Sequence, residues 1–393
     1  MRWSVRLGRV NGAPVEAHWL LGGLLAWVAY SGWARDGWGG LAAAAGLLVA
    51  GFGSILVHEA AHTVQAQALG FPVRRIWLLP FGGLALLGKL PERPRDELRI
   101  ALAGPVVNLG LGLVCAALAG IYFSANPIRS APEFELRLVL LRGGPAIPYG
   151  LIMLALTNLG LFVFNLAPAF PFDGARVLRS LLALVVRRSR ATRAVAVLGW
   201  ALGLGGLLVG AALARRFGSG AMLTVLLMGI TAILGASAED MFERQRQVLL
   251  SLPVRAAVPQ PTLTLAPGDA LTPALAAALQ AAAHLPLLPV VDQGRMVGLL
   301  PRQAVAEALA RPKAPAVTVA ERMLPPDGWL DANADLWSAQ QDLGDDAQAA
   351  LPVLDGEHLY GMLTAADIRA TLLEPSAMLR IQPSQLIAAG SRL

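Results

Sequence analysis

Two histidines and a glutamate stand close together in the stretch from Ile55 to Gly70, which reads ILVHEAAHTVQAQALG. On an α-helix His58 and His62 are four residues apart, so they share a face and can point both imidazoles at one zinc ion. Glu59 follows the first histidine and can take a proton from a water bound to that ion. The spacing predicts a zinc site with Glu59 as the general base of a hydrolysis.

The segment that carries this motif is apolar. No charged residue occurs from Trp38 to Val57, and the run is long enough to enter a bilayer. A charged side chain at the centre of a bilayer costs about 2.5–3.5 kcal/mol on insertion scales. A cluster of ionisable residues in such a segment therefore indicates a functional site with a bound partner.

The whole chain has the composition of a membrane protein. Of its 393 residues, 55% are hydrophobic and 15% are charged, whereas soluble proteins have about 25% charged residues. The net charge of +6 is spread in short groups beside apolar segments, which fits membrane topology and argues against nucleic acid as a partner. One cysteine excludes an intramolecular disulfide. The basic N-terminus lacks a signal-peptide cleavage pattern, so we expect it to be retained.

Six apolar segments predict a polytopic α-helical membrane domain of about six transmembrane helices within residues 1–240. They run roughly over residues 18–33, 38–70, 100–123, 148–172, 194–214 and 217–238, each close to or above the ~20 residues that span a bilayer. Fifteen arginines and lysines lie in residues 2–9, 74–99 and 176–193, against six in the alternate connections. The positive-inside rule then places both termini in the cytoplasm and the zinc motif inside the bilayer, nearer the cytoplasmic side.

A catalytic zinc ion usually has three protein ligands, and Asp173 is the best candidate for the third. It lies in the stretch from Asn165 to Gly174, NLAPAFPFDG, where Pro168 and Pro171 must disrupt helical hydrogen bonding. Freed backbone groups are tolerated at membrane depth only where protein or a wet cavity satisfies them. We expect this stretch to line the site. The alternative is that Asp173 merely ends the fourth segment at the cytoplasmic surface.

The connection between the second and third segments, Phe71 to Leu90, contains two prolines and a Gly-Gly pair that exclude a spanning helix. Short apolar runs on both sides of the Gly-Gly pair suggest a β-hairpin at the membrane surface, with a plain loop as the alternative. The open edge of such a hairpin could bind an extended peptide by strand addition.

The third segment opens with AGPVVN, residues 103–108. Gly104 permits close packing of helices. Asn108 could hydrogen-bond a ligand, a water or the substrate backbone, or it could join two helices.

Taken together, these motifs resemble the site-2 protease family of intramembrane zinc metalloproteases. The matching pieces are HExxH at 58–62, AGPxxN at 103–108 and NxxPxxPxDG at 165–174, and they cover about the first 240 residues. The resemblance implies His58, His62 and Asp173 as ligands of one zinc ion per chain, Glu59 as the base, and Asn108 and Asn165 near the substrate or water. It also suggests a bacterial inner membrane. Ala175 departs from the glycine that often follows Asp-Gly in the family.

From about Val254 the chain becomes more charged and richer in proline, and a repeat appears with an offset of 63 residues. LPVVD at 288–292 matches LPVLD at 351–355, and GLL at 298–300 matches GML at 361–363. Each copy predicts helix, strand, turn, strand, helix. The repeat resembles a tandem pair of CBS domains, which implies a cytoplasmic α/β module that binds an adenine nucleotide such as ATP and forms homodimers. We expect a linker at 241–253, the two domains at 254–312 and 313–375, and a tail at 376–393.

The nucleotide motif of such domains, Gly-x-x-Ser/Thr-x-x-Asp, is present in the second copy as Gly361, Thr364 and Asp367. The first copy has Pro301 and Ala304 at the corresponding offsets. The alternative is structural: Thr364 caps a helix and Asp367 stands at its third position.

The sequence thus predicts an intramembrane zinc metalloprotease that cleaves peptide bonds within or next to transmembrane segments, in regulated intramembrane proteolysis, under control of the CBS pair. A metal-dependent transporter or channel with CBS regulation is the alternative, because intramembrane histidines, aspartates and broken helices also occur in transporters. An inactive membrane scaffold is the third interpretation.

Overall fold

The structure of the protein is a computed structural model, and it describes residues 4–79, 82–125, 146–217, 219–282, 285–310, 317–344 and 349–373. The chain divides into two compact units, residues 1–242 and 243–393, and each is described by itself. The predicted tail at 376–393 lies outside the described residues.

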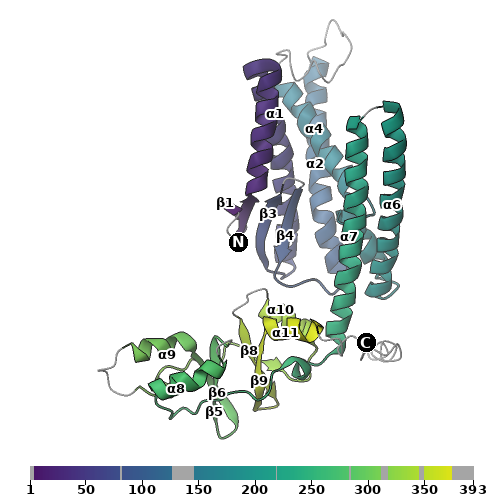
Figure 1. Cartoon of the computed structure of the whole chain (residues 1–393). Coiled ribbons are helices and arrows are strands. Elements are labelled where there is room, and N and C mark those ends of the chain that lie inside the picture. The colour runs from purple at the N-terminus through teal and green to yellow at the C-terminus, as the bar shows by residue number, and fades with distance from the viewer. Residues whose placement is uncertain are drawn as a thin grey trace. The chain divides into compact units, whose positions relative to one another are not determined.

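The first unit consists mainly of long apolar helices (Figure 1). Its helices are α1 (Trp19–Ala68), α2 (Pro94–Ala125), α4 (Ala146–Asn165), α5 (Asp173–Leu182), α6 (Arg188–Phe217) and α7 (Ser219–Ser251). Within the described residues, four of them (α1, α2, α6 and α7) are long and apolar enough to cross a membrane, and α4 adds a shorter apolar helix. A polytopic α-helical membrane fold agrees with the prediction, and the number of six crossings stays a prediction.

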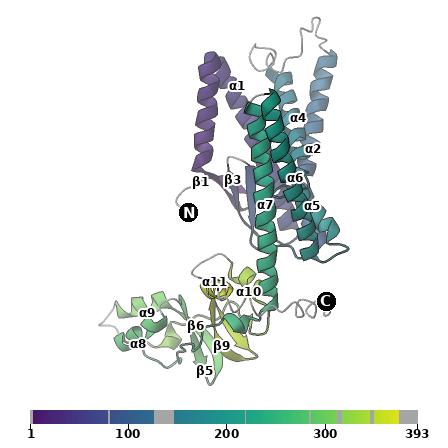
Figure 2. The same ribbon diagram turned by 45° about the vertical axis from the view of Figure 1, so that its right-hand side comes forward.

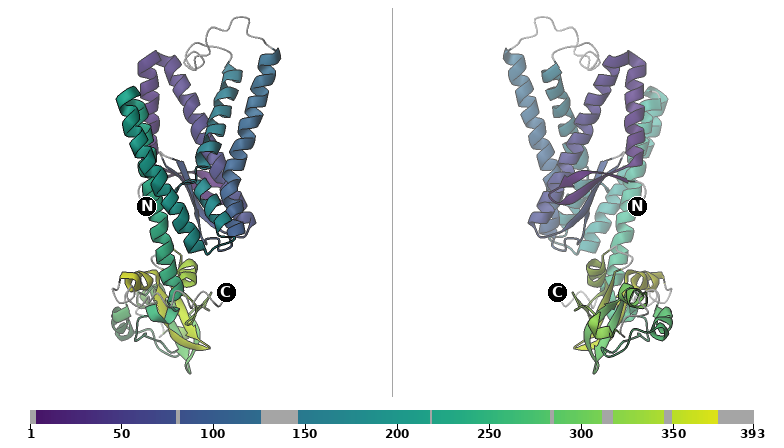
Figure 3. Two further views of the ribbon diagram at one scale, coloured as in Figure 1. Left: turned by 90° about the vertical axis from the view of Figure 1, so that its right-hand side faces the viewer. Right: turned by 90° about the vertical axis from the view of Figure 1, so that its left-hand side faces the viewer.

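Helix α1 contains both the first and the second predicted segments, with a kink between them. Asp36 and Gly37 have non-helical backbone angles, and Gly37 lies at φ 55°, a conformation that favours glycine. The kink separates two arms that diverge from it (Figure 3). The arms meet closely beside the kink: a Cβ atom at Gly32 would stand 2.5 Å from the Gly40 carbonyl oxygen.

A four-stranded sheet belongs to the same unit, with strands β1 (Ser4–Val10), β2 (Ala13–His18), β3 (Val73–Leu79) and β4 (Gly82–Leu87) in the order β1-β2-β3-β4. The β3–β4 pair is antiparallel, so the predicted hairpin is confirmed and the plain loop is wrong. Strand β2 joins the N-terminal hairpin to it by parallel pairing with β3.

The N-terminal hairpin was not predicted, although its sequence carries a signal for it. Asn11 and Gly12 both have positive φ, 44° and 83°, as a two-residue turn between antiparallel strands requires. An Asn-Gly pair between residues that alternate in polarity is the usual sign of such a turn.

Glycines let the helices pack closely in two places. Helices α2 and α4 meet at Gly112, where an added Cβ would stand 2.7 Å from the Leu159 Cγ atom. Helices α6 and α7 run side by side (Figure 2) and meet at Gly203, where the Ile233 side chain fills the space next to the backbone. These contacts are the small-residue packing that apolar helices use when water supplies no driving force.

The second unit repeats one motif twice. The first copy has α8 (Pro273–Ala278), β5 (Leu287–Asp292), β6 (Arg295–Pro301) and α9 (Arg302–Leu309). The second has α10 (Leu336–Leu343), β8 (Ala350–Asp355), β9 (His358–Thr364) and α11 (Ala365–Leu373). Short elements complete the unit: the 3₁₀ turns at 254–257, 279–282 and 319–321, and strand β7 (Leu330–Asp331). The helix, strand, turn, strand, helix order is confirmed in both copies.

The two copies agree in register as well as in order. Leu288 pairs with Leu300 in the first hairpin and Leu351 with Leu363 in the second. A bulge falls between residues 290 and 291 in one copy and between 353 and 354 in the other, again 63 residues apart. The strands form one five-stranded sheet in the order β5-β6-β9-β8-β7.

The α2–α4 contact leads to a prediction on stability. We expect Gly112→Ala to destabilise the first unit by about 1–3 kcal/mol, because the new methyl group must push Leu159 aside in a packed interface. Thermal unfolding of the purified protein in detergent measures the change. Gly110→Ala on the same helix is the matched control, because nothing lies within 4 Å of its Cβ position. Equal unfolding temperatures for both variants would contradict the packing argument.

Candidate metal centre

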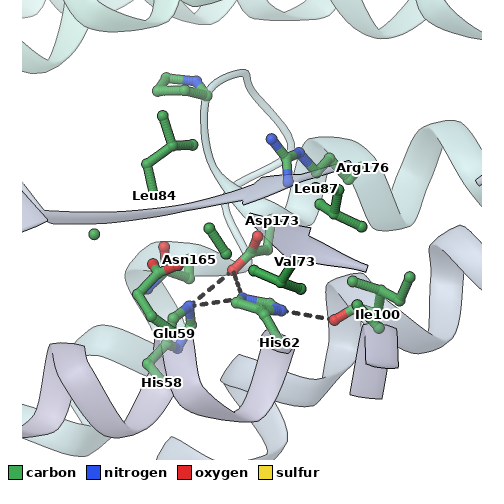
Figure 4. Close-up of a pocket in the computed structure, with 14 residues that line it drawn as sticks. His58, Glu59, His62, Val73, Leu84, Leu87, Ile100, Asn165, Asp173 and Arg176 are labelled. Atoms are coloured by element: carbon green, nitrogen blue, oxygen red, sulfur yellow. Dashed lines mark hydrogen bonds and ion pairs between the residues drawn. The ribbon is translucent and has the colours of Figure 1, made fainter. Parts of the chain in front are cut away.

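The three predicted metal ligands come together from two helices. His58 and His62 lie on the second arm of α1, and Asp173 is the first residue of α5. All three are buried, with 5–8% of their surface exposed. Within the described part of the chain, they form the one group of three such side chains whose ligand atoms lie within 4.8 Å of each other. Figure 4 shows them facing a common point.

The three ligand atoms form an almost equilateral triangle. The Asp173 Oδ2 atom lies 3.0 Å from His58 Nε2 and 3.1 Å from His62 Nε2, and the two Nε2 atoms are 3.1 Å apart. Ligand atoms about 2.0–2.1 Å from a tetrahedral zinc ion are separated by about 3.3 Å. Two imidazoles and a carboxylate at this spacing fit zinc, with a fourth position left for water or substrate.

The far nitrogen of each imidazole is held by a neighbour on α2. The His62 Nδ1 atom lies 2.7 Å from the Ile100 carbonyl oxygen, so Nδ1 carries the proton and Nε2 keeps its lone pair for a metal. The His58 Nδ1 atom lies 3.1 Å from the Asn108 amide. The Asn108 Oδ1 atom is buried without a partner, and turning this amide end for end lets Oδ1 accept the Nδ1 proton. Both histidines can then offer Nε2 to the ion.

Helix α2 approaches the centre at Gly104. A Cβ atom here would stand 2.6 Å from His58 Nε2 and would also overlap His62 Nε2. The predicted close packing at Gly104 is therefore confirmed, and the neighbours that require it are the two imidazoles themselves.

Asp173 reaches the centre because the fourth apolar segment is broken, as predicted. Helix α4 ends at Asn165 and α5 starts only at Asp173. The start of α5 packs against the connection that follows α4, because a Cβ at Gly174 would stand 2.5 Å from the Ala167 carbonyl oxygen. Ala175, the departure from the family pattern, is fully buried beside Phe170 and Val195.

Ion pairs hold α5 in place. Arg179, 3% exposed, pairs with Glu97 of α2 and with Glu239 of α7. Arg188, at the start of α6, pairs with the second oxygen of Glu97 at 2.8 Å. The guanidinium of Arg179 also lies over the Phe170 ring, 5.2 Å from its centre. Four helices thus meet at one charged cluster, which no motif in the sequence marks.

A pocket of about 90 Å³ opens at the metal centre and is lined by Glu59, Asn165 and Arg176 beside the three ligands. About 10–15 Å³ of such space holds one water, so several waters or a short piece of substrate fit. Strand β4 forms one wall: a Cβ atom at Gly83 would stand 2.7 Å from the Glu59 carboxyl carbon. Glu59 is itself only 8% exposed.

The two predicted asparagines differ in their positions. Asn165 lines the pocket and donates a hydrogen bond to the Leu161 carbonyl oxygen at 3.0 Å. Asn108 is fully buried behind His58 and is absent from the pocket lining. Its hydrogen bond to His58 joins α2 to α1, the second interpretation of this residue, and a place near substrate or water stays a prediction.

Thr364 and Asp367 belong to the second unit and have no part in this centre. The Thr364 N–H and hydroxyl both donate to Asp367 Oδ2, at 2.9 Å and 2.6 Å, and the Asp367 N–H donates back to Thr364 Oγ1 at 3.3 Å. This reciprocal arrangement is a capping box at the start of α11. The structural alternative for these two residues is therefore present in the protein.

The fold and the centre define an integral membrane protein with a buried His-His-Asp metal site and an adjacent glutamate. The sequence matches the family described as peptidase family M50 over residues 46–141 and 145–206. A zinc metalloprotease of Methanocaldococcus jannaschii is 32% identical over 219 residues, which are 53% of this chain and 55% of that protein. The chain thus spans about half the length of this curated relative.

A solved structure of the site-2 protease from Methanocaldococcus jannaschii is 30% identical; the match covers 61% of this chain and 95% of that one, with a TM-score of 0.43. In the matched part the chain resembles peptidase family M50, the family of site-2 type zinc metalloproteases.

The second unit is similar to a CBS domain of a membrane protein from Sphaerobacter thermophilus. That match is 19% identical, covers 35% of this chain and 98% of that one, and has a TM-score of 0.29. The evidence for a domain pair is therefore the internal repeat, which appears both in the sequence and in the strand register.

The position of Gly104 leads to a prediction on metal binding. We expect Gly104→Ala to weaken zinc binding about 10- to 100-fold, the range for groups that position metal ligands, because the methyl group must displace both imidazoles. Zinc titration with elemental analysis of the purified protein measures it. Gly110→Ala on the same helix should bind zinc like the wild type, and wild-type affinity in Gly104→Ala would show that α2 is not a tight wall of the centre.

Proposed function

We propose that the protein is an intramembrane zinc metalloprotease that hydrolyses peptide bonds within or next to transmembrane segments of membrane proteins. The observation that carries the proposal is the convergence of His58 Nε2, His62 Nε2 and Asp173 Oδ2 to 3.0–3.1 Å beside the buried Glu59. The matches to peptidase family M50 and to a zinc metalloprotease support it. The role of each residue below belongs to this proposal.

One zinc ion per chain would be held by His58, His62 and Asp173. Bound there, it supplies Lewis acidity toward the scissile carbonyl group and the attacking water. Asn108 and the Ile100 carbonyl group keep the two imidazoles in the tautomer that leaves Nε2 free. Residues held this way need no rearrangement when the substrate arrives.

Glu59 is the general base of this proposal. Its carboxylate takes the proton of the attacking water and then delivers a proton to the nitrogen of the leaving amine. Strand β4 packs against the Glu59 side chain at Gly83, which restricts the carboxylate to the pocket. Asn165 lines the same pocket and can hydrogen-bond the water or the substrate.

The substrate must be locally unwound, because helical hydrogen bonds shield the peptide bond inside a transmembrane segment. Strand β4 is an edge of the sheet, and its residues Gly83, Leu84 and Ala85 line the pocket. An extended substrate can add to this edge by main-chain hydrogen bonds. Peptide binding and catalysis would then share one wall.

We further infer six membrane crossings, with the two arms of α1 as the first two and α4 as the fourth. Both termini and the CBS pair would be cytoplasmic, in a bacterial inner membrane. Clusters of arginine and lysine at alternate connections support this orientation, and the apolar lengths of the helices support the crossings.

The role of Glu59 can be tested directly. We expect Glu59→Gln to retain zinc and to lose cleavage of membrane-segment substrates by a factor of at least about 100, because a carboxamide cannot accept the proton of the water. A library of single-spanning segments in detergent or vesicles, with zinc content assayed in parallel, provides the measurement.

Gly53→Ala, on the same helix as Glu59, is the matched control and should cleave like the wild type, because nothing lies within 4 Å of its Cβ position. Unchanged cleavage in Glu59→Gln would refute the proposed mechanism. Zinc binding without cleavage by the wild type, together with zinc-dependent ion flux in vesicles, would instead favour the transporter or channel, which needs no base.

We also infer that the CBS pair regulates the protease by binding an adenine nucleotide such as ATP at the second copy. The support for this site is the spacing of Gly361, Thr364 and Asp367, which matches the nucleotide motif in the second copy. Asp367 would have to exchange its capping contacts with Thr364 for ribose hydroxyl groups. Homodimers through the CBS pair belong to the same proposal.

A double variant tests the nucleotide site. We expect Thr364→Ala/Asp367→Ala to abolish binding of ATP or AMP in calorimetric titration of the whole protein. Loss of a helix cap lowers the free energy of unfolding by about 1 kcal/mol. The control variant must therefore lose a helix cap as well. Thr318→Ala/Glu321→Ala removes a second capping box, at the 3₁₀ turn 319–321, and should retain binding. A double variant at 364 and 367 that keeps the nucleotide response would refute the assignment.

A further inference from the structure

One arginine at the metal centre differs from the other charged residues around it. Arg179 and Arg188 are paired with buried carboxylates, and Asp173 faces two imidazoles. The side chain of Arg176 forms no hydrogen bond or ion pair with any residue that the structure describes. It is nevertheless half-buried rather than extended into solvent.

Arg176 faces the pocket in which the reaction takes place. It lies on α5, three residues after Asp173, and lines the pocket together with Glu59 and Asp173. Leu84 and Leu87 of β4 line the same pocket. Figure 4 shows the Arg176 side chain extending from α5 toward β4, over the metal ligands.

An unpaired guanidinium in such a place needs a partner. Arginine carries five N–H donors and keeps its charge at all relevant pH values. Charged residues within membrane proteins are paired with each other or with backbone carbonyl groups. The other members of the pocket wall near β4 are apolar. Asp173 is engaged by the two imidazoles, and Glu59, which lines the same pocket, is the base of the proposed reaction and makes no hydrogen bond or ion pair with Arg176 among the described residues. Main-chain oxygens of the substrate are the acceptors that remain for the guanidinium.

The substrate has such acceptors once it is unwound. A transmembrane helix that opens into an extended segment exposes carbonyl oxygens that no water can satisfy at membrane depth. An edge strand such as β4 pairs only one side of that segment and leaves the carbonyl groups on its other side without donors. A guanidinium can donate to two such oxygens at once.

We propose that Arg176 is a substrate-binding residue whose guanidinium donates hydrogen bonds to main-chain carbonyl oxygens of the unwound substrate next to the scissile bond. This inference rests on the proposed protease function. It adds a donor on the side of the substrate away from β4, and it makes recognition depend on extended backbone rather than on a particular side chain.

The test uses the whole protein in vesicles and one single-spanning segment that the wild type cleaves. A hydrogen bond to a charged group accounts for a change of about 10- to 100-fold. We expect Arg176→Gln to lower kcat/KM by that factor, with most of the loss in KM, and to keep the zinc content and unfolding temperature of the wild type. Arg176→Lys keeps the charge but lacks the planar guanidinium that donates to two oxygens. Its kcat/KM should fall between those of the wild type and Arg176→Gln. Arg190→Gln, an exposed arginine on α6 outside the pocket lining, should be unchanged.

A second substrate separates backbone recognition from side-chain recognition. In it, every charged side chain near the cleavage site is replaced by an uncharged one. The same loss on both substrates supports the proposal, and a loss confined to a substrate with an acidic side chain overturns it in favour of a charge-selective pocket. Wild-type kinetics in Arg176→Gln overturn it as well. If the wild type cleaves no segment of the library, the protease function fails and this inference with it.

Discussion

The structure depends on the cost of holding a charged metal site in an apolar segment. A buried polar atom without a hydrogen-bond partner costs several kcal/mol in hydrocarbon. Each histidine therefore needs a partner for the ring nitrogen that does not face the metal. His62 meets the Ile100 carbonyl group and His58 meets Asn108, and both partners lie on α2. The approach of α2 to the imidazoles is possible only because residue 104 has no side chain. The second and third apolar segments are thus coupled through the ligands rather than through general packing.

Asp173 imposes the second constraint, because it must enter the membrane domain from a short helix. Helix α5 has ten residues, too few to be stable on its own. Arg179 holds α5 by ion pairs with Glu97 and Glu239, and Arg188 forms a second ion pair with Glu97. Removing one partner of a buried pair leaves an uncompensated charge and costs about 3–5 kcal/mol. The cluster therefore fixes where Asp173 stands relative to the histidines of α1, although none of its members touches the metal site.

Much of this arrangement can be predicted from the sequence because membrane segments leave few alternatives. Helical period brings His58 and His62 to one face, and the prolines before Asp173 exclude a continuous helix there. Contacts between residues far apart in the chain cannot be predicted in this way. The parallel pairing of β2 with β3 joins residues about 60 positions apart, and nothing in the sequence of either strand indicates the other as its partner. Arg179 and Glu97 look like ordinary charges at helix ends, and the position of Arg176 follows only from the way α5 packs. Thr364 and Asp367 fit two interpretations in sequence, and the capping contacts are the one that the protein displays.

The contact between Gly83 and Glu59 connects the sheet to the chemistry. A strand that touches the base at a residue without a side chain can bring an added substrate strand close to the metal ligands, because neighbouring strands lie only about 4.8 Å apart. Any larger residue at 83 would move either the strand or the carboxylate. Under the proposed function, the edge of this sheet would hold an unwound segment beside the metal ligands. Recognition and hydrolysis would then depend on one spacing, the distance from β4 to α1, which the parallel β2–β3 pair and the β3–β4 hairpin hold in place.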